Sequence, residues 1–283
     1  MLVVSTLLLT SPLLAFQKSN PVNANPVLLL TRTTTRHEVR RFGYGGTVTI
    51  IGAPKGSITV EGWSRSEVEV TADIELLAES EGDLNLLAAV NTFVFDEDTN
   101  HLSLLSTGTH DRVFMKRVAK DFPKRLLNLP WKIDYRLHVP TSTDIEINAG
   151  SGAIKLGGVE GAVRLSATES ETMLTLTGGI VSATIAAGNV RVVIPVRSWR
   201  GSGADIRLAA GDLTLELPAG FNGDIDADIL RSGKIVNSYE ELQPREKPGL
   251  TDQIVRARAG AGGASFKFAV GAGTLYITKN TSQ

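Results

Sequence analysis

Apolar and polar residues alternate with a period of two along most of the chain after residue 26, which is the pattern of strands that bury one face. In the first half this alternation occupies residues 37–42, 47–51, 57–60 and 67–74. Residues 81–90 form the one candidate for a short helix in this half. Two apolar segments, 92–95 and 101–105, flank the turn-forming residues 96–100 and predict a hairpin.

Short strands separated by glycines follow from Tyr135 onward. The clearest repeat relates Gly188–Pro195 to Gly211–Pro218, which share Gly-[Asn/Asp]-[Val/Leu]-x-[Val/Leu]-x-[Ile/Leu]-Pro at an offset of 23 residues. Weaker copies begin at Gly152, Gly161, Asp205, Gly223 and Gly273. Two strands per repeat of this length are typical of a solenoid, whose coils bury their apolar faces by stacking on one another. An immunoglobulin-like sandwich has similar strand spacing but seldom repeats one motif so closely.

We therefore predict an all-β fold: a β-solenoid or β-roll of short glycine-cornered strands with an N-terminal β-rich segment. Three features resemble the putative-adhesin family of bacterial exported β-solenoid domains, a family of unknown biochemical function. They are Gly56–Trp63 followed by Glu67–Val70, then Asp134–Pro140, and the train of Gly-x-Ile/Val-x-Leu units, together covering about residues 35–279. The resemblance implies an extended β-roll in the cell envelope and carries over no catalytic residue.

The N-terminal residues indicate export. Leu2–Phe16 is an apolar run interrupted by Pro12, shorter than the roughly 20 apolar residues of a membrane span. It fits the apolar region of a signal peptide, with cleavage after Ala15 or Ala24. Neither Lys nor Arg precedes the run, so an uncleaved anchor stays open, as does a buried N-terminal strand. We expect export to the periplasm or cell surface.

Composition narrows the possible chemistry. The 283 residues include no cysteine, which excludes disulfides, thiolate metal sites, cysteine nucleophiles and a lipidated cysteine. With 29 basic and 30 acidic residues the net charge is −1, which argues against nucleic acid as a partner. The sequence also lacks the serine-hydrolase elbow and the phosphate-binding glycine loops. We predict no catalytic residue, no metal site and no cofactor.

Residues 110–138 depart from the strand pattern and from the family resemblance. They hold eight basic and three acidic residues, a local charge of +5, interleaved with Phe114, Phe122 and other apolar side chains. Three interpretations stay open: a cap over the end of the sheet, which we favour, a surface for an anionic partner, or a solvated loop. On the second interpretation the contacts would be made by Arg112, Lys116, Arg117, Lys120, Lys124, Arg125 and Trp131.

Three partial motifs have structural explanations. His37-Glu38 begins a zinc-protease pattern but has Arg41 where the second histidine belongs. Residues 96–100 have the spacing that opens a calcium loop, but His101 stands where that loop needs glycine, so we predict a polar hairpin tip. The acidic row Asp224, Asp226 and Asp228 shares one strand face, which we interpret as a solvated outer face. A cation site or a pair of glycosidase carboxyls is the alternative for this row.

These features divide the chain into a signal peptide (1–24), an N-terminal β-rich segment (27–110), a basic amphipathic insert (111–133) and a β-solenoid region (134–279). We expect a non-catalytic, adhesin-like binding or structural protein of the cell envelope. Its expected partner is an envelope or cell-surface ligand such as an acidic glycan or an anionic lipid. The alternative is a polysaccharide-acting enzyme on a β-solenoid scaffold, because fold alone does not decide function.

Overall fold

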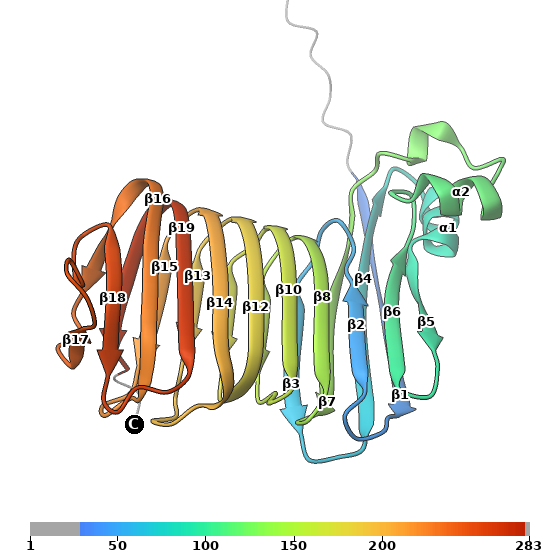
Figure 1. Ribbon diagram of the computed structural model, residues 1–283. Coiled ribbons are helices and arrows are strands. Elements are labelled where there is room, and N and C mark those ends of the chain that lie inside the picture. Colours follow the sequence, from blue (N-terminus) through green and yellow to red (C-terminus); the bar gives the residue numbers. More distant parts are fainter. Residues whose placement is uncertain (1–28, 281–283) are drawn as a thin grey trace, which may run out of the picture.

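The computed structural model describes residues 29–280, which are built mainly from strands (Figure 1). Hydrogen bonds between neighbouring strands connect the 19 strands of these residues into one mixed sheet. The prediction of an all-β chain is therefore confirmed. The predicted signal peptide lies outside the described residues. Within residues 29–280, no helix is long and apolar enough to cross a membrane.

Five parallel strands lie side by side and make up what we call the first stack (Figure 1). They are β2 (Thr47–Ile51), β8 (Asp144–Ser151), β10 (Ala162–Glu169), β12 (Gly178–Ala187) and β14 (Arg200–Ala210). The pairing aligns Val48, Ile145, Val163, Val181 and Ala204 in one row across the stack. All five side chains are buried, so each strand extends the same apolar surface.

Five further parallel strands form the second stack. They are β3 (Ile58–Trp63), β9 (Ile154–Gly157), β11 (Thr172–Thr175), β13 (Val190–Val193) and β15 (Leu213–Leu217). β13 and β15 contain the two best-matched sequence segments, and Val190 lies opposite Leu213. The 23-residue offset in the sequence is thus the register of this strand pair.

Two long strands continue both stacks toward the C-terminus. β19 (Ser265–Lys279) pairs with β14 through its first half and with β15 through its second half. β16 (Gly223–Asn237) lies parallel to β19 on the far side. The parallel order then ends, because β18 (Ile254–Ala259) pairs antiparallel with β16 and β17 (Leu242–Pro244) pairs antiparallel with β18.

Antiparallel strands also finish the N-terminal end. β4 (Glu67–Ala78) lies between β1 (Leu30–Arg41) and β7 (Trp131–Pro140) and is antiparallel to both. β7 leads into the second stack through its parallel pairing with β3. β5 (Thr92–Glu97) and β6 (His101–Thr107) form the predicted hairpin, and β6 joins the first stack beside β2.

The inward residues of the two stacks and of the terminal strands form one continuous apolar core. Burial alternates along β4 and β15, as the period-two pattern predicts for strands with one buried face. Tyr135, one of the largest buried side chains, is 1% exposed, and its hydroxyl lies 2.7 Å from the hydroxyl of Ser106. This hydrogen bond compensates the burial of both hydroxyl groups, and burial raises the pKa of Tyr135.

Stacked glycines form one corner between the first and second stacks. Gly211 has a φ of +129°, and a Cβ built on it would lie 1.8 Å from the carbonyl oxygen of Gly188 on the preceding strand pair. Gly273 repeats the arrangement against Gly211, with a φ of +145° and the same 1.8 Å approach. Glycine is required here because the corner needs a left-handed backbone and leaves no room for a side chain.

Helices occur at the N-terminal end of the molecule, beside β4 and β6 (Figure 1). The predicted helix is confirmed as α1 (Glu81–Val90), whose N-cap Ser80 accepts a hydrogen bond from the backbone nitrogen of Asp83. Its buried Leu84 and Leu87 join the core. The basic insert contributes α2 (Arg112–Val118) and a 3-10 turn, η1 (Lys124–Leu126).

Candidate ligand-binding pocket in the basic insert

The basic insert is anchored on the molecule at both of its ends. Asp111 caps α2 by accepting hydrogen bonds from the backbone nitrogens of Val113 and Phe114, at 2.8 and 3.0 Å. Met115 in α2 and Leu126 in η1 are buried. Each of the two helical elements of the insert therefore buries one apolar side chain.

The aromatic side chains of the insert only partly match what a cap would require. Trp131, at the start of β7, is 8% exposed and belongs to the core. Phe122 is half-buried and packs against the core from outside, and Phe114 is also half-buried. The insert thus covers part of the N-terminal end of the sheet while keeping an accessible apolar surface of its own.

Arg125 joins the insert to α1. Its guanidinium donates two hydrogen bonds to the carboxylate of Asp83, at 2.6 and 2.7 Å. Asp83 is only 6% exposed, and this guanidinium holds the pKa of its carboxyl below the ordinary value. Arg125, a predicted contact for an anionic partner, is thus paired with Asp83 of α1.

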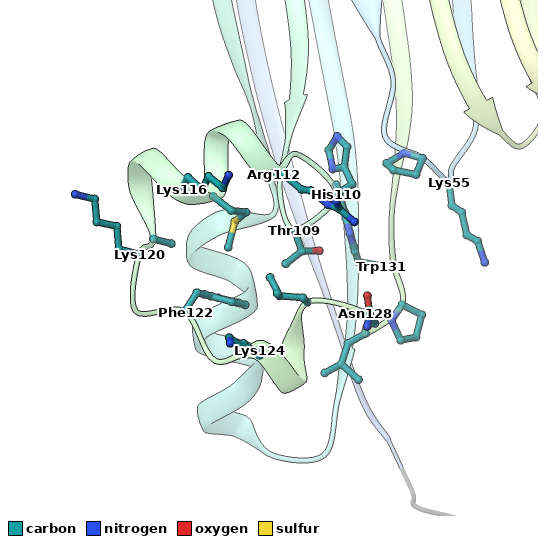
Figure 2. Close-up of a pocket in the computed structure, with 16 residues that line it drawn as sticks. Lys55, Thr109, His110, Arg112, Lys116, Lys120, Phe122, Lys124, Asn128 and Trp131 are labelled. Atoms are coloured by element: carbon teal, nitrogen blue, oxygen red, sulfur yellow. The ribbon is translucent and has the colours of Figure 1, made fainter.

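A pocket of about 950 Å³ opens between the insert and the loop that joins β2 to β3 (Figure 2). Half of its lining residues have apolar side chains, and these belong to both sides of the pocket. They are Pro54, Met115, Ala119, Phe122, Leu127, Leu129, Pro130 and Trp131. A volume of this size lies within the range of pockets that hold small organic ligands.

Five cationic side chains also line this pocket, and its lining contains no carboxylate. Four were predicted as contacts, namely Arg112, Lys116, Lys120 and Lys124 from the insert, and the fifth is Lys55. Lys116 and Lys120 lie on one side of the pocket and Lys55 on the other (Figure 2). Among residues 29–280, no acidic side chain forms an ion pair with any of the five. Their positive charge is therefore available to a ligand.

The remaining lining residues are Thr109, His110 and Asn128. The His110 ring lies 5.3 Å from the Trp131 ring, measured between centroids, and its pKa is lowered by burial. A lowered pKa favours the neutral imidazole near pH 7. The lining around Trp131 therefore includes a second aromatic ring.

Part of this pocket could be predicted from the sequence. Arg112, Lys116, Lys120, Lys124 and Trp131 line it together, whereas Arg117 and Arg125 do not. Lys55 and Pro54 were missed because they come from a loop more than 50 residues earlier in the chain. The backbone nitrogen of Ile133 donates to the carbonyl of Lys55 at 3.2 Å and so holds that loop beside the end of the insert.

The acidic row on β16 alternates with buried Ile225 and Ala227, as predicted for a strand with one outer face. Arginines neutralise it: Arg258 contacts Asp224 at 2.7 Å, Arg256 contacts Asp228 at 2.7 Å, and Arg245 contacts Asp226. The hydrogen bond from Arg258 lowers the pKa of Asp224. All three carboxylates are therefore held in ion pairs with arginines.

Two other candidate motifs are structural. Asp98 accepts hydrogen bonds from the backbone nitrogens of Asn100 and His101, at 3.1 and 3.0 Å, and so forms the tip of the hairpin. His37 lies in β1 and is 3.5 Å from Glu69 of β4. In the described part of the chain, no cluster of three His, Asp or Glu side chains could hold a metal ion.

Trp63 and Trp199 lie apart from the pocket and have their own partners. The indole of Trp63 stacks on His138 with 5.0 Å between ring centroids and donates to the carbonyl of Glu67. The indole of Trp199 packs edge-on against Phe266 and donates to the carbonyl of Gly179. The three tryptophans therefore do not form a common platform for a sugar chain.

Neither a family model nor a curated protein matches the sequence. Among solved structures, a putative cell adhesion protein from Clostridium sporogenes ATCC 15579 aligns with 87% of this chain and 100% of its own, at 13% identity and a TM-score of 0.40. A putative adhesin from Bacteroides fragilis NCTC 9343 aligns with 89% of this chain and 97% of its own, at 13% identity and a TM-score of 0.30. A putative lipid binding protein from Parabacteroides distasonis ATCC 8503 aligns with 88% and 97%, at 12% identity and a TM-score of 0.24. Likeness at this level carries no argument about function.

Proposed function

We propose that this protein is an exported, non-catalytic binding module of the cell envelope and that the pocket in its basic insert holds an anionic partner. The observation that carries the proposal is the lining of that pocket, in which five cations without acidic partners occur together with eight apolar side chains. Like charges gathered in one place raise the local potential, and that potential attracts ligands of opposite charge. An acidic glycan and an anionic lipid both meet this requirement.

The remainder of the chain serves, in this proposal, as a rigid support. The parallel pairing of successive strands supports a β-solenoid or β-roll, in which each coil is stabilised by its neighbours. Such a support would hold the insert at one end of an elongated body. Export rests on the N-terminal sequence pattern and on the family resemblance.

The proposal is tested by measuring binding to polygalacturonate and to phosphatidylglycerol vesicles, with dextran and phosphatidylcholine vesicles as uncharged or zwitterionic controls. We expect binding to at least one anionic probe, weakening as salt shortens the screening length to about 8 Å at physiological ionic strength. Lys116→Glu should weaken it strongly, because Lys116 lines the pocket.

The matched control is Arg117→Glu, which makes the same change of charge on the next residue of α2 but outside the pocket. Equal weakening by the two variants would show that general charge, and not the pocket, attracts the partner. Failure to bind either anionic probe at low salt would overturn the proposal.

The alternative, a polysaccharide-acting enzyme, would draw its carboxyls from the acidic row on β16. The ion pairs of Asp226 with Arg245 and of Asp228 with Arg256 weigh against it. Turnover of any of the glycans, abolished by Asp226→Asn, would favour the enzyme over the binding module.

A further inference from the structure

We propose that the pocket in the basic insert binds the acyl chain of an anionic lipid, with the lipid's charged headgroup held by the lysines at its edge. This inference rests on the proposed function, that the pocket is a site for anions, and it names the class of anion. It follows from the combination of apolar and cationic residues in one lining.

The apolar lining requires an apolar ligand group. Phe122 projects into the pocket from the insert (Figure 2), and the half-buried Leu127 and Leu129 line it as well. Filling the pocket with hydrocarbon removes this surface from water, which is favourable in proportion to the apolar area buried. A ligand that is charged along its whole length would instead place its polar groups against apolar side chains.

The cations require a negative headgroup. Lys116, Lys120 and Lys124 present flexible ammonium groups, and Arg112 adds a guanidinium that can bind phosphate or carboxylate oxygens in pairs. Because the lining has no carboxylate, nothing in it repels an anion. The cationic side chains of the lining, and not its aromatic rings, would hold the head.

An acidic glycan fits the same pocket less well. Sugar hydroxyls need hydrogen-bonding side chains, and apart from the cations the lining offers only Thr109, His110 and Asn128. Sugars also stack on exposed aromatic faces, whereas Trp131 is only 8% exposed. A glycan would leave several hydroxyls unpaired against the apolar lining, which is unfavourable.

The first experiment measures calorimetric affinity for lysophosphatidylglycerols that differ only in chain length, each below its micelle-forming concentration. Burial of one further methylene is expected to tighten binding about fourfold, until the chain fills the pocket. Lysophosphatidylcholine of the same chain length should bind at least about tenfold more weakly, because its headgroup has no net charge.

Two pairs of variants separate the chain from the headgroup. Ala119→Trp fills the pocket without changing charge and should abolish the dependence on chain length. Val113→Trp is its control, because it places the same indole on an α2 residue that is 78% exposed and outside the pocket. Lys116→Glu should weaken binding of the anionic lipid and leave binding of lysophosphatidylcholine nearly unchanged. Arg117→Glu is the control for this variant. Leu127→Trp replaces Ala119→Trp if the latter unfolds, as judged by its melting curve.

The outcomes distinguish the two proposals. Binding of polygalacturonate, with lysophosphatidylglycerol affinity independent of chain length, would overturn the lipid inference and leave the anion site standing. Equal affinity for lysophosphatidylglycerol and lysophosphatidylcholine would also overturn it, because the cations would then play no part. Absence of binding to any anionic probe would overturn both proposals.

Discussion

Replacing Gly211 by alanine tests whether the stacked corner sets the spacing between successive strand pairs. The new Cβ would lie 1.8 Å from the carbonyl oxygen of Gly188, far inside van der Waals contact. Neither glycine can shift freely, because their backbone nitrogens donate hydrogen bonds to the carbonyls of Ala272 and Ala210. The φ of +129° adds backbone strain of about 1–3 kcal/mol for a residue with a side chain. Relieving the overlap must displace a packed strand, which costs about 1–3 kcal/mol more.

Gly263→Ala is the matched control for Gly211→Ala. Gly263 has nearly the same φ, +132°, but no atom lies within 4 Å of where its Cβ would be. Strain and the reduced entropy of the unfolded chain therefore affect both variants alike, and the difference between them isolates the steric overlap. We expect Gly211→Ala to be less stable than Gly263→Ala by about 1–3 kcal/mol.

Thermal and urea unfolding followed by circular dichroism measure this difference. Each kcal/mol corresponds to about 2–4 °C in melting temperature for a domain of 150–250 residues, so the two melting curves should be clearly separated. Equal destabilisation by the two substitutions would refute the reasoning, because the close approach of the Gly211 and Gly188 backbones would then contribute nothing.

Three further predictions concern the insert and the core. Arg125→Ala should lower the melting temperature, and adding Asp83→Asn should recover part of the loss, because the double variant no longer buries an unpaired carboxylate. The lowered pKa of His110 means that the unfolded chain binds a proton at this histidine more readily than the folded chain does. The free energy of unfolding should therefore fall as the pH drops below about 6.5. His110→Phe should lessen that fall, as measured by urea unfolding between about pH 7.5 and 5.5. Tyr135→Phe should lower the free energy of unfolding in urea by about 1–3 kcal/mol, because it leaves the buried hydroxyl of Ser106 without its partner. An unchanged urea midpoint would instead show that water replaces the hydrogen bond.

Much of the strand structure could be predicted from the sequence because its causes are local. Alternation of apolar and polar residues identifies the buried face of a strand such as β4 without reference to its neighbours. The hairpin of β5 and β6 follows from turn residues within a few positions of each other. The sequence repeat also indicates the register of β13 and β15, since Val190 and Leu213 occupy equivalent places in two similar segments and lie opposite each other.

Which charged side chains form ion pairs could not be predicted, because ion pairs join residues that are distant in the sequence. Arg125 and Lys124 are adjacent and equally basic, yet Arg125 meets Asp83 while Lys124 lines the pocket. The arginines that neutralise the acidic row come from the chain that folds back onto β16, about 20–35 residues later. The residues next to Arg125 or to the acidic row in the sequence do not indicate which of these ion pairs form.

The pocket likewise depends on tertiary structure. The sequence by itself determined that residues 111–133 are basic and amphipathic, and this was enough to select four of the five cations that line it. Tertiary structure decided that Lys55 and Pro54 face them, because a backbone hydrogen bond between Ile133 and Lys55 brings the loop after β2 to the start of β7. A concave site requires walls from separate segments, and the distance between such segments is set by the packing of the whole sheet and not by any one stretch of sequence.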